Sequence, residues 1–320
     1  MKYLAAFVIS GLVTALAMAW VVHALPMQIY EESYPMYAYE KAVEEAPARE
    51  PATTLIVGDS RAKASLLPDK LGAGSLSLTL PGASAIELYH AADRYLSRHP
   101  APRNVVLSIS AVHFGDANIF WERPIKFGYL DQVAVSEVLD QAQRLGDPTF
   151  GSPWEARFSY LLHRLNSPHL YLPELRRAVF QPHGAANQQL LAQLERERGH
   201  CFFGTAPRSN GLAYEDFHEQ FAPSPTFDHY FRKLIDRLRA TGARVVFMAM
   251  PLNQRSRQQL KPGFVQSYDR YFAGIARDYP DVEVRASWPL LDDEYFGDAN
   301  HVNGRGSEVV TRMARDMLSL

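Results

Sequence analysis

Ser60 follows a short apolar run and stands where a serine can act as a nucleophile. Residues 55–61 read Leu-Ile-Val-Gly-Asp-Ser-Arg, so an apolar strand enters a Gly-Asp turn and a helix can begin at the serine. A side chain at the end of a buried strand faces the crevice where α/β proteins bind ligands. Read alone, the tripeptide is also an ordinary turn, since Gly, Asp and Ser all favour turns.

A second group near the end of the chain supplies what a serine nucleophile needs. The stretch reads Asp298-Ala-Asn-His301 and is followed by Val-Asn-Gly. A histidine can take the proton of a serine, and a carboxylate can orient that histidine. The three residue types together predict a serine-dependent acyl-transfer enzyme.

The elements that must position these groups alternate between strands and helices. We expect strands at 53–57, 76–80, 104–110, 244–250 and 282–286. Helical spacing predicts helices at 84–98, with Ser84 as N-cap, and at 226–241, 264–278 and from about 303 to 317. Buried strands separated by helices are typical of a three-layer α/β fold with a parallel sheet.

The middle of the chain does not show this alternation of strands and helices. Between about 115 and 225 we expect helices at 130–146, 154–165, 172–180 and 186–199 and no strand. This helical insertion either shapes a substrate groove or is a helical layer without a ligand role. The folded domain would then cover 53–320, with the insertion inside it.

The first 25 residues predict export. Leu4–Val22 carries no charge and is long enough to cross a bilayer core of about 30 Å. Lys2 precedes the run and the first charges after it are acidic, which places the N-terminus in the cytoplasm and the rest outside it. A cleaved signal peptide is the alternative, with Ala17-Met-Ala19 as its site, and both interpretations export the domain. Residues 26–52 contain four prolines and several glutamates and are expected to form a juxtamembrane stalk.

The two motifs resemble those of the SGNH (GDS-type) hydrolase superfamily. The resemblance implies a flavodoxin-like fold in which Ser60 is the nucleophile, His301 the general base and Asp298 its orienting carboxylate. It also implies an oxyanion hole formed by the backbone N–H groups of Ser60 and Gly82, the latter in Pro81-Gly82-Ala83 after the second strand. The family's Gly-x-Asn-Asp block is missing, because the third strand runs into Leu-Ser-Ile-Ser110-Ala-Val-His. Ser110 is the candidate third donor, and the loss of one donor can cost roughly 10²–10³ in rate.

A narrower resemblance concerns the branch. A Gly-Asp-Ser-Arg motif with a late Asp-x-x-His-x-Asn behind an N-terminal anchor is similar to the alginate O-acetyltransferase-like and teichoic-acid D-alanylation branches. This implies a protein of the inner membrane with its domain in the periplasm, which transfers an acyl group, acetyl being the first choice, from a donor to a cell-envelope or secreted polysaccharide. A membrane-bound O-acyltransferase is the implied partner. The alternatives are a carbohydrate or lipid esterase with the same triad, and a catalytically weak, polymer-binding scaffold of an export complex.

Four further residues are candidates for substrate binding: Asp59, Arg61, His113 and Asn303. Arg61 could instead be solvated on a surface helix, Asn303 could be the N-cap of the last helix, and His113 could be an ordinary loop residue. The 11 scattered histidines form no metal motif, so we expect no metal. No phosphate-binding or dinucleotide fingerprint is present, so we expect no cofactor. The net charge of −2 with dispersed basic residues gives no indication of a nucleic-acid partner.

Overall fold

The computed structural model describes residues 1–31, 33–47, 50–165, 168–213 and 219–320. A parallel sheet of five strands forms its centre, in the order β2-β1-β3-β4-β6. The strands are β1 (Thr54–Gly58), β2 (Leu76–Thr79), β3 (Asn104–Ser108), β4 (Arg244–Met248) and β6 (Glu283–Arg285). All four pairings are parallel, so the predicted α/β class with a parallel sheet is confirmed.

Helices cover both faces of the sheet. Leu55 and Val57 of β1 pack on one face in a core shared with α5 (Ala85–Leu96), α11 (Pro225–Arg239) and α13 (Pro262–Asp278). Ile56, between them in sequence, faces the other side and packs with α4 (Ser60–Ser65) and α14 (Gly304–Leu318). Because successive strand side chains point to opposite faces, a continuous apolar run serves both layers.

The order of the strands reverses between β1 and β3. The chain leaves β1 toward β2 on one side, then returns to β3 on the other. At such a point the loops after the two strands diverge and leave a crevice at the carboxyl end of the sheet. Ser60 follows β1 and Ser110 follows β3, so both lie at this crevice.

The predicted helices begin and end close to the expected residues. Ser84 caps α5 through its hydroxyl oxygen, which accepts the N–H of Ile86, and the Glu87 carboxylate accepts the N–H of Ser84, as in a capping box. In the insertion, the described residues contain helices and no strand: α6 (Asn118–Phe120), a π-helical turn (Trp121–Ile125), α7 (Gln132–Arg144), a 3-10 turn (Pro148–Phe150), α8 (Pro153–Arg164), α9 (Pro168–Phe180) and α10 (Gly184–Arg196).

The prediction of a juxtamembrane stalk at 26–52 is wrong for the central part of this segment. After α1 (Lys2–Ala24) and α2 (Pro26–Ile29), residues Ser33–Glu45 form α3, which packs against α5 and α10. Glu40 and Glu44 are completely buried because Lys63 and Arg94 neutralise them. Acidic residues that look solvated in the sequence are therefore part of the core.

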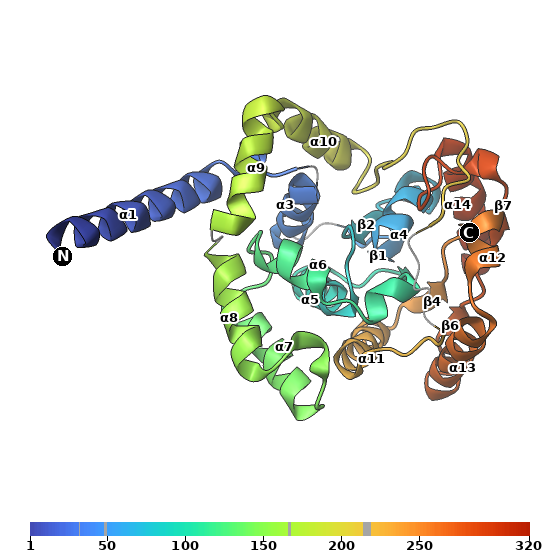
Figure 1. Cartoon of the computed structure of the whole chain (residues 1–320). Helices are drawn as coiled ribbons and strands as arrows, with labels where there is room; N and C mark the ends of the chain where they lie inside the picture. The colour runs from blue at the N-terminus through green and yellow to red at the C-terminus, as the bar shows by residue number, and fades with distance from the viewer. Residues whose placement is uncertain (32, 48–49, 166–167, 214–218) are drawn as a thin grey trace.

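A second, two-stranded sheet of β5 (Leu252–Asn253) and β7 (Leu290–Leu291), with α12 (Gln254–Gln259) after β5, lies beside α14 (Figure 1). This sheet is absent from the sequence-based prediction.

Candidate active site

Asp59 fixes the position of Ser60. Its buried carboxylate caps α4 by accepting the backbone N–H of Arg61 at 2.9 Å and of Ala62 at 3.4 Å. Its other oxygen accepts the N–H of Ser110 at 2.8 Å. The side chain thus joins the loops after β1 and β3 below Ser60. It is buried from solvent, which does not support the expected contact of Asp59 with substrate.

Ser60, His301 and Asp298 form one chain of hydrogen bonds. His301 Nε2 lies 2.9 Å from Ser60 Oγ, and His301 Nδ1 lies 2.9 Å from Asp298 Oδ2 and 3.1 Å from Oδ1. With Nδ1 as the donor to the carboxylate, Nε2 is left as the acceptor for the serine proton. The structure thus brings the three predicted residues together, although Ser60 and His301 are 241 positions apart.

A short loop presents the histidine and the aspartate. Phe296 and Val302 pair across an antiparallel bridge and are both buried, which closes the loop between them. Asp298 Oδ1 accepts the backbone N–H groups of Asn300 and His301, each at 2.7 Å. Burial alone would raise the pKa of the Asp298 carboxyl, but the hydrogen bonds from His301 and from these two N–H groups outweigh it and lower this pKa. The carboxylate is held ionised beside the imidazole.

A segment after α10 braces this loop, and sequence reasoning missed it. The ring of Phe203 stacks on the imidazole of His301. Gly204 lies against Gly297 so closely that a Cβ on Gly297 would stand 1.9 Å from the Gly204 carbonyl oxygen. Both positions therefore require glycine. The pair of glycines, one directly after Phe203 and one directly before Asp298, is the only sign of this contact in the sequence.

Arg61 and Asn303 both hold the site together rather than lie in solvent. Arg61 is buried and donates from Nη2 to the side-chain oxygen of Asn300 at 3.4 Å, linking the nucleophile helix to the histidine loop. Asn303 caps α14 through Oδ1 and donates from Nδ2 to the carbonyls of Glu294 and Phe296. The sequence predicts that Asn303 either binds substrate or caps the last helix, and the structure shows it as the helix cap.

Gly82 stands on the turn after β2, at the same edge of the sheet as Ser60. Its φ of 71° lies in the left-handed region, and a Cβ there would meet Arg123 Nη1 at 2.7 Å. Arg123 donates to the carbonyl of Pro81 at 2.7 Å and so fixes the peptide plane that precedes Gly82. The role of Gly82 as an oxyanion donor stays a prediction. Ser110 follows β3 across the crevice, with its backbone held by Asp59.

His113 belongs to the same cluster of polar groups. Its Nε2 lies 3.7 Å from Asp59 Oδ2. Burial lowers the pKa of His113, and the neighbouring Arg61 and Arg123 add to this while Asp59 opposes it. A neutral imidazole next to the buried carboxylate supports the loop after β3.

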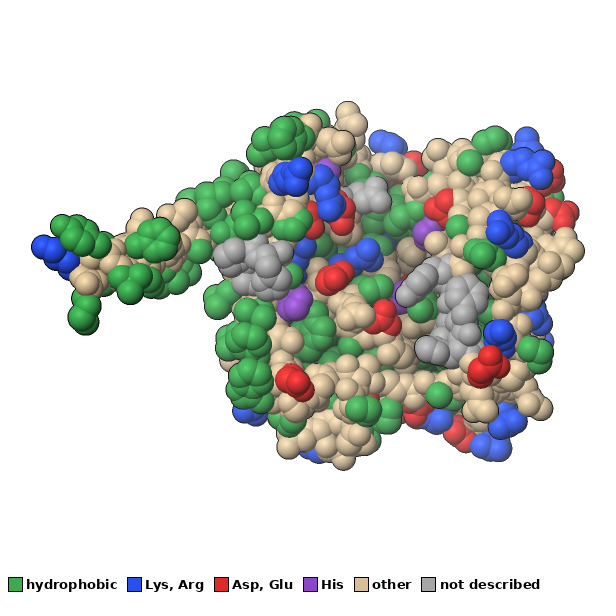
Figure 2. Space-filling view, viewed as in Figure 1, with side chains coloured by type: hydrophobic (Ala, Val, Ile, Leu, Met, Phe, Trp, Pro, Cys, Tyr) green, Lys and Arg blue, Asp and Glu red, His purple; other side chains and the backbone are tan. Residues whose placement is uncertain are grey.

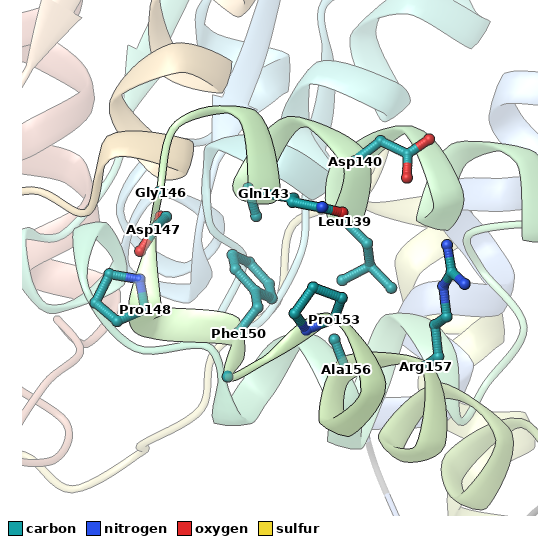
Figure 3. A pocket seen from close by; sticks show the side chains of 12 residues that line it. Leu139, Asp140, Gln143, Gly146, Asp147, Pro148, Phe150, Pro153, Ala156 and Arg157 are labelled. Atoms are coloured by element: carbon teal, nitrogen blue, oxygen red, sulfur yellow. The ribbon is translucent and has the colours of Figure 1, made fainter.

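A separate cavity of about 210 Å³ lies between α7 and α8 (Figure 3). Phe150 and Pro153 line it, and so does Asp147, which accepts the N–H groups of Thr149 and Thr226. It contains none of the triad residues. Within the described ranges no three His, Cys, Asp or Glu side chains are grouped to hold a metal ion.

Comparison of the chain with protein-family models and with curated proteins found no match.

Proposed function

We propose that this chain is a membrane-anchored, serine-dependent O-acyltransferase of the SGNH type. The proposal rests on the hydrogen-bonded chain of Ser60, His301 and Asp298. In it, Nε2 of His301 lies 2.9 Å from Ser60 Oγ and Nδ1 lies 2.9 Å from Asp298 Oδ2. The strand order supports it: counted within the main sheet, it reads 2-1-3-4-5, the flavodoxin-like order, with the triad at its switch point.

The chemistry follows from the geometry. His301 Nε2 takes the proton of Ser60 as Oγ forms a bond to the carbonyl carbon of an acyl ester. The tetrahedral oxyanion is stabilised by the N–H groups of Ser60 and Gly82. Its collapse breaks the bond to the leaving oxygen, which receives the proton from His301. The acyl-serine is then attacked by an acceptor hydroxyl, whose proton passes to His301 and back to Ser60.

The acceptor we propose is a hydroxyl of a cell-envelope polysaccharide, and the group transferred is acetyl. Among the residues that the structure describes, one helix, α1, is long and apolar enough to span a membrane or to serve as a signal sequence. An exported domain meets envelope polymers, and a membrane-bound O-acyltransferase is the partner that would deliver the acyl group.

The test follows the covalent intermediate in the full-length chain. Protein in detergent is mixed with 4-nitrophenyl acetate and its intact mass is recorded over time, with and without an oligosaccharide acceptor. We expect an acetyl adduct on the wild type that the acceptor discharges faster than water does. Ser60→Ala should form none, whereas the exposed Ser97→Ala should match the wild type. An adduct cleared equally fast without acceptor means an esterase, and no adduct on the wild type would overturn the catalytic assignment.

A further inference from the structure

The outer faces of α8 and α9 carry apolar side chains that the protein leaves uncovered. On α8 they are Trp154, Phe158, Leu161 and Leu165, exposed at 71%, 46%, 53% and 61%. Their spacing of four, three and four residues aligns them in a single stripe along the helix. Leu172, Val179 and Phe180 are exposed on α9.

These two helices lie at the edge of the domain from which α1 projects. Figure 1 shows α8 and α9 along that edge, and Figure 2 shows hydrophobic side chains gathered over α8 there. Tyr171 of α9 donates to the carbonyl of Ala15 in α1 at 3.4 Å and is buried with Val22 in a small shared core. His23, near the end of α1, hydrogen-bonds to the backbone of Arg164, at the end of α8.

The length of α1 indicates that lipid covers this edge of the domain. Residues 1–14 are exposed throughout, and the contact with α9 begins at Ala15. The helical residues 2–14 extend about 20 Å at ~1.5 Å each, whereas a bilayer core is about 30 Å thick. If α1 spans, roughly seven further residues must lie in hydrocarbon, and Tyr171 touches that part of α1. Exposed Trp20 falls where an aromatic residue marks the membrane interface.

We infer that α8 and α9 lie in the outer leaflet of the bilayer, so that the domain rests on the lipid with this face. This inference rests on the membrane anchor of the proposed function and adds a second, interfacial contact to it. Arg157 lies on one flank of the α8 stripe, beside the cavity between α7 and α8, and Arg176 lies among the apolar residues of α9. An arginine at these positions can place its guanidinium group at the lipid phosphates while its methylene groups stay among the lipid acyl chains. The domain is thereby held in one orientation, and the crevice with Ser60 stays at a fixed height above the membrane.

The experiment places spin labels on the full-length chain in vesicles of phosphatidylethanolamine and phosphatidylglycerol. In a Cys201→Ala background, single cysteines replace Leu161, Leu165 and Val179. Leu12→Cys reports on α1, and Leu290→Cys is the matched control, an exposed leucine on β7 at the opposite end of the domain. Collision with oxygen, which concentrates in lipid, is compared with collision with a water-soluble nickel chelate.

The oxygen-to-nickel ratio should be several-fold higher at positions 161, 165 and 179 than at 290, and close to that at 12. Water-like ratios at these three positions, with a lipid-like ratio at 12, would overturn the inference. Low collision with both reagents would also overturn it, since the face would then be covered by another protein or a second copy. A water-like ratio at 12 removes the anchor on which the inference rests. Ser60→Ala protein must give the same ratios, so failure of this inference is separable from failure of the catalytic proposal.

Discussion

The ring of Phe203 lies flat against the imidazole of His301, with 4.5 Å between the ring centroids and 25° between their planes. Asp298 holds one edge of the imidazole and Ser60 meets the other, but neither prevents the ring from tilting out of their common plane. The stacked phenyl ring fills one face of the imidazole, and the Gly204–Gly297 contact fixes the backbone that carries it.

Phe203→Ala should therefore slow acylation of Ser60 by about tenfold, which corresponds to a rise of roughly 1.4 kcal/mol in the activation free energy. Phe203→Tyr keeps the stacked ring and should retain most of the rate. The measurement is the single-turnover rate of acetyl-enzyme formation. Equal rates for Phe203→Ala and the wild type would show that the stacking does not position the histidine.

Asp59→Asn should damage the site although asparagine is as good a helix cap as aspartate. One amide oxygen can still accept the N–H groups at the start of α4, but the –NH₂ group then faces the N–H of Ser110, which loses its acceptor. We expect a loss of about 1–3 kcal/mol in the free energy of unfolding. The control is Asp131→Asn, since Asp131 caps α7 with a single oxygen. Urea unfolding of both variants checks this, and equal, small losses would contradict it.

Much of this fold is predictable because its signals are local. The helix expected at 226–241 is observed at Pro225–Arg239, since apolar spacing and Pro225 at its first turn define it. The grouping of Ser60, His301 and Asp298 is predictable from two short motifs because these motifs resemble those of a known superfamily.

The errors come from contacts between distant parts of the chain. The sequence around Glu40 and Glu44 looks like a solvated stalk because their partners, Lys63 and Arg94, lie 23 and 50 positions away. The strands β5 and β7 have two residues each, too few for an alternating pattern. Phe203 lies nearly 100 positions before His301, and no local pattern marks it as its neighbour.

The buried ion pair of Glu40 with Lys63, which lies close to Ser60 in the sequence, should show strong coupling. Lys63, one turn after Ser60, donates to the carbonyl of Gly199 at 2.7 Å and contacts Glu40 Oε1 at 3.3 Å, with both side chains inaccessible. Burial raises the pKa of the Glu40 carboxyl and Lys63 opposes this rise. Lys63→Met leaves Glu40 without its cation and should cost about 3–5 kcal/mol.

Adding Glu40→Gln to Lys63→Met should recover part of this loss, because no isolated charge is then buried. A double-mutant cycle by urea unfolding measures the coupling. The exposed pair of Lys70 and Glu308 is the control, and Lys70→Met should cost no more than about 1 kcal/mol. Additive effects of the two substitutions at 40 and 63 would contradict a direct interaction.

Two buried histidines should each lower the stability of the protein in mild acid, because both are neutral in the folded state. Burial lowers the pKa of His200 to about 4, although its ring hydrogen-bonds to the carbonyl of Ala64, which opposes this. His90 is lowered to about 4 as well, first by burial and then by Arg94. The unfolded chain has histidine pKa values near 6.5, so it binds more protons than the folded chain between pH 6.5 and 4. Stability is therefore lost as the pH falls through this window, on the order of 2–3 kcal/mol for each histidine.

Urea midpoints of the full-length chain in detergent, measured from pH 7 to pH 4, check this prediction. His200→Gln keeps a donor for Ala64 but cannot titrate, so its midpoint should fall less steeply than that of the wild type. His90→Gln isolates the second contribution in the same way. Below pH 4 both histidines are protonated in the folded and the unfolded chain, so further losses must come from carboxylates such as Asp147. Burial alone would raise the pKa of the Asp147 carboxyl, but its hydrogen bonds from Ser224, Thr149 and Thr226 lower this pKa to about 2. Because the raised pKa values of the buried Glu40 and Glu87 carboxyls act in the opposite direction, the test is the difference between each variant and the wild type. Midpoints of His200→Gln and His90→Gln that follow the same pH dependence as the wild type from pH 7 to 4 would show that the two imidazoles are not buried in their neutral form.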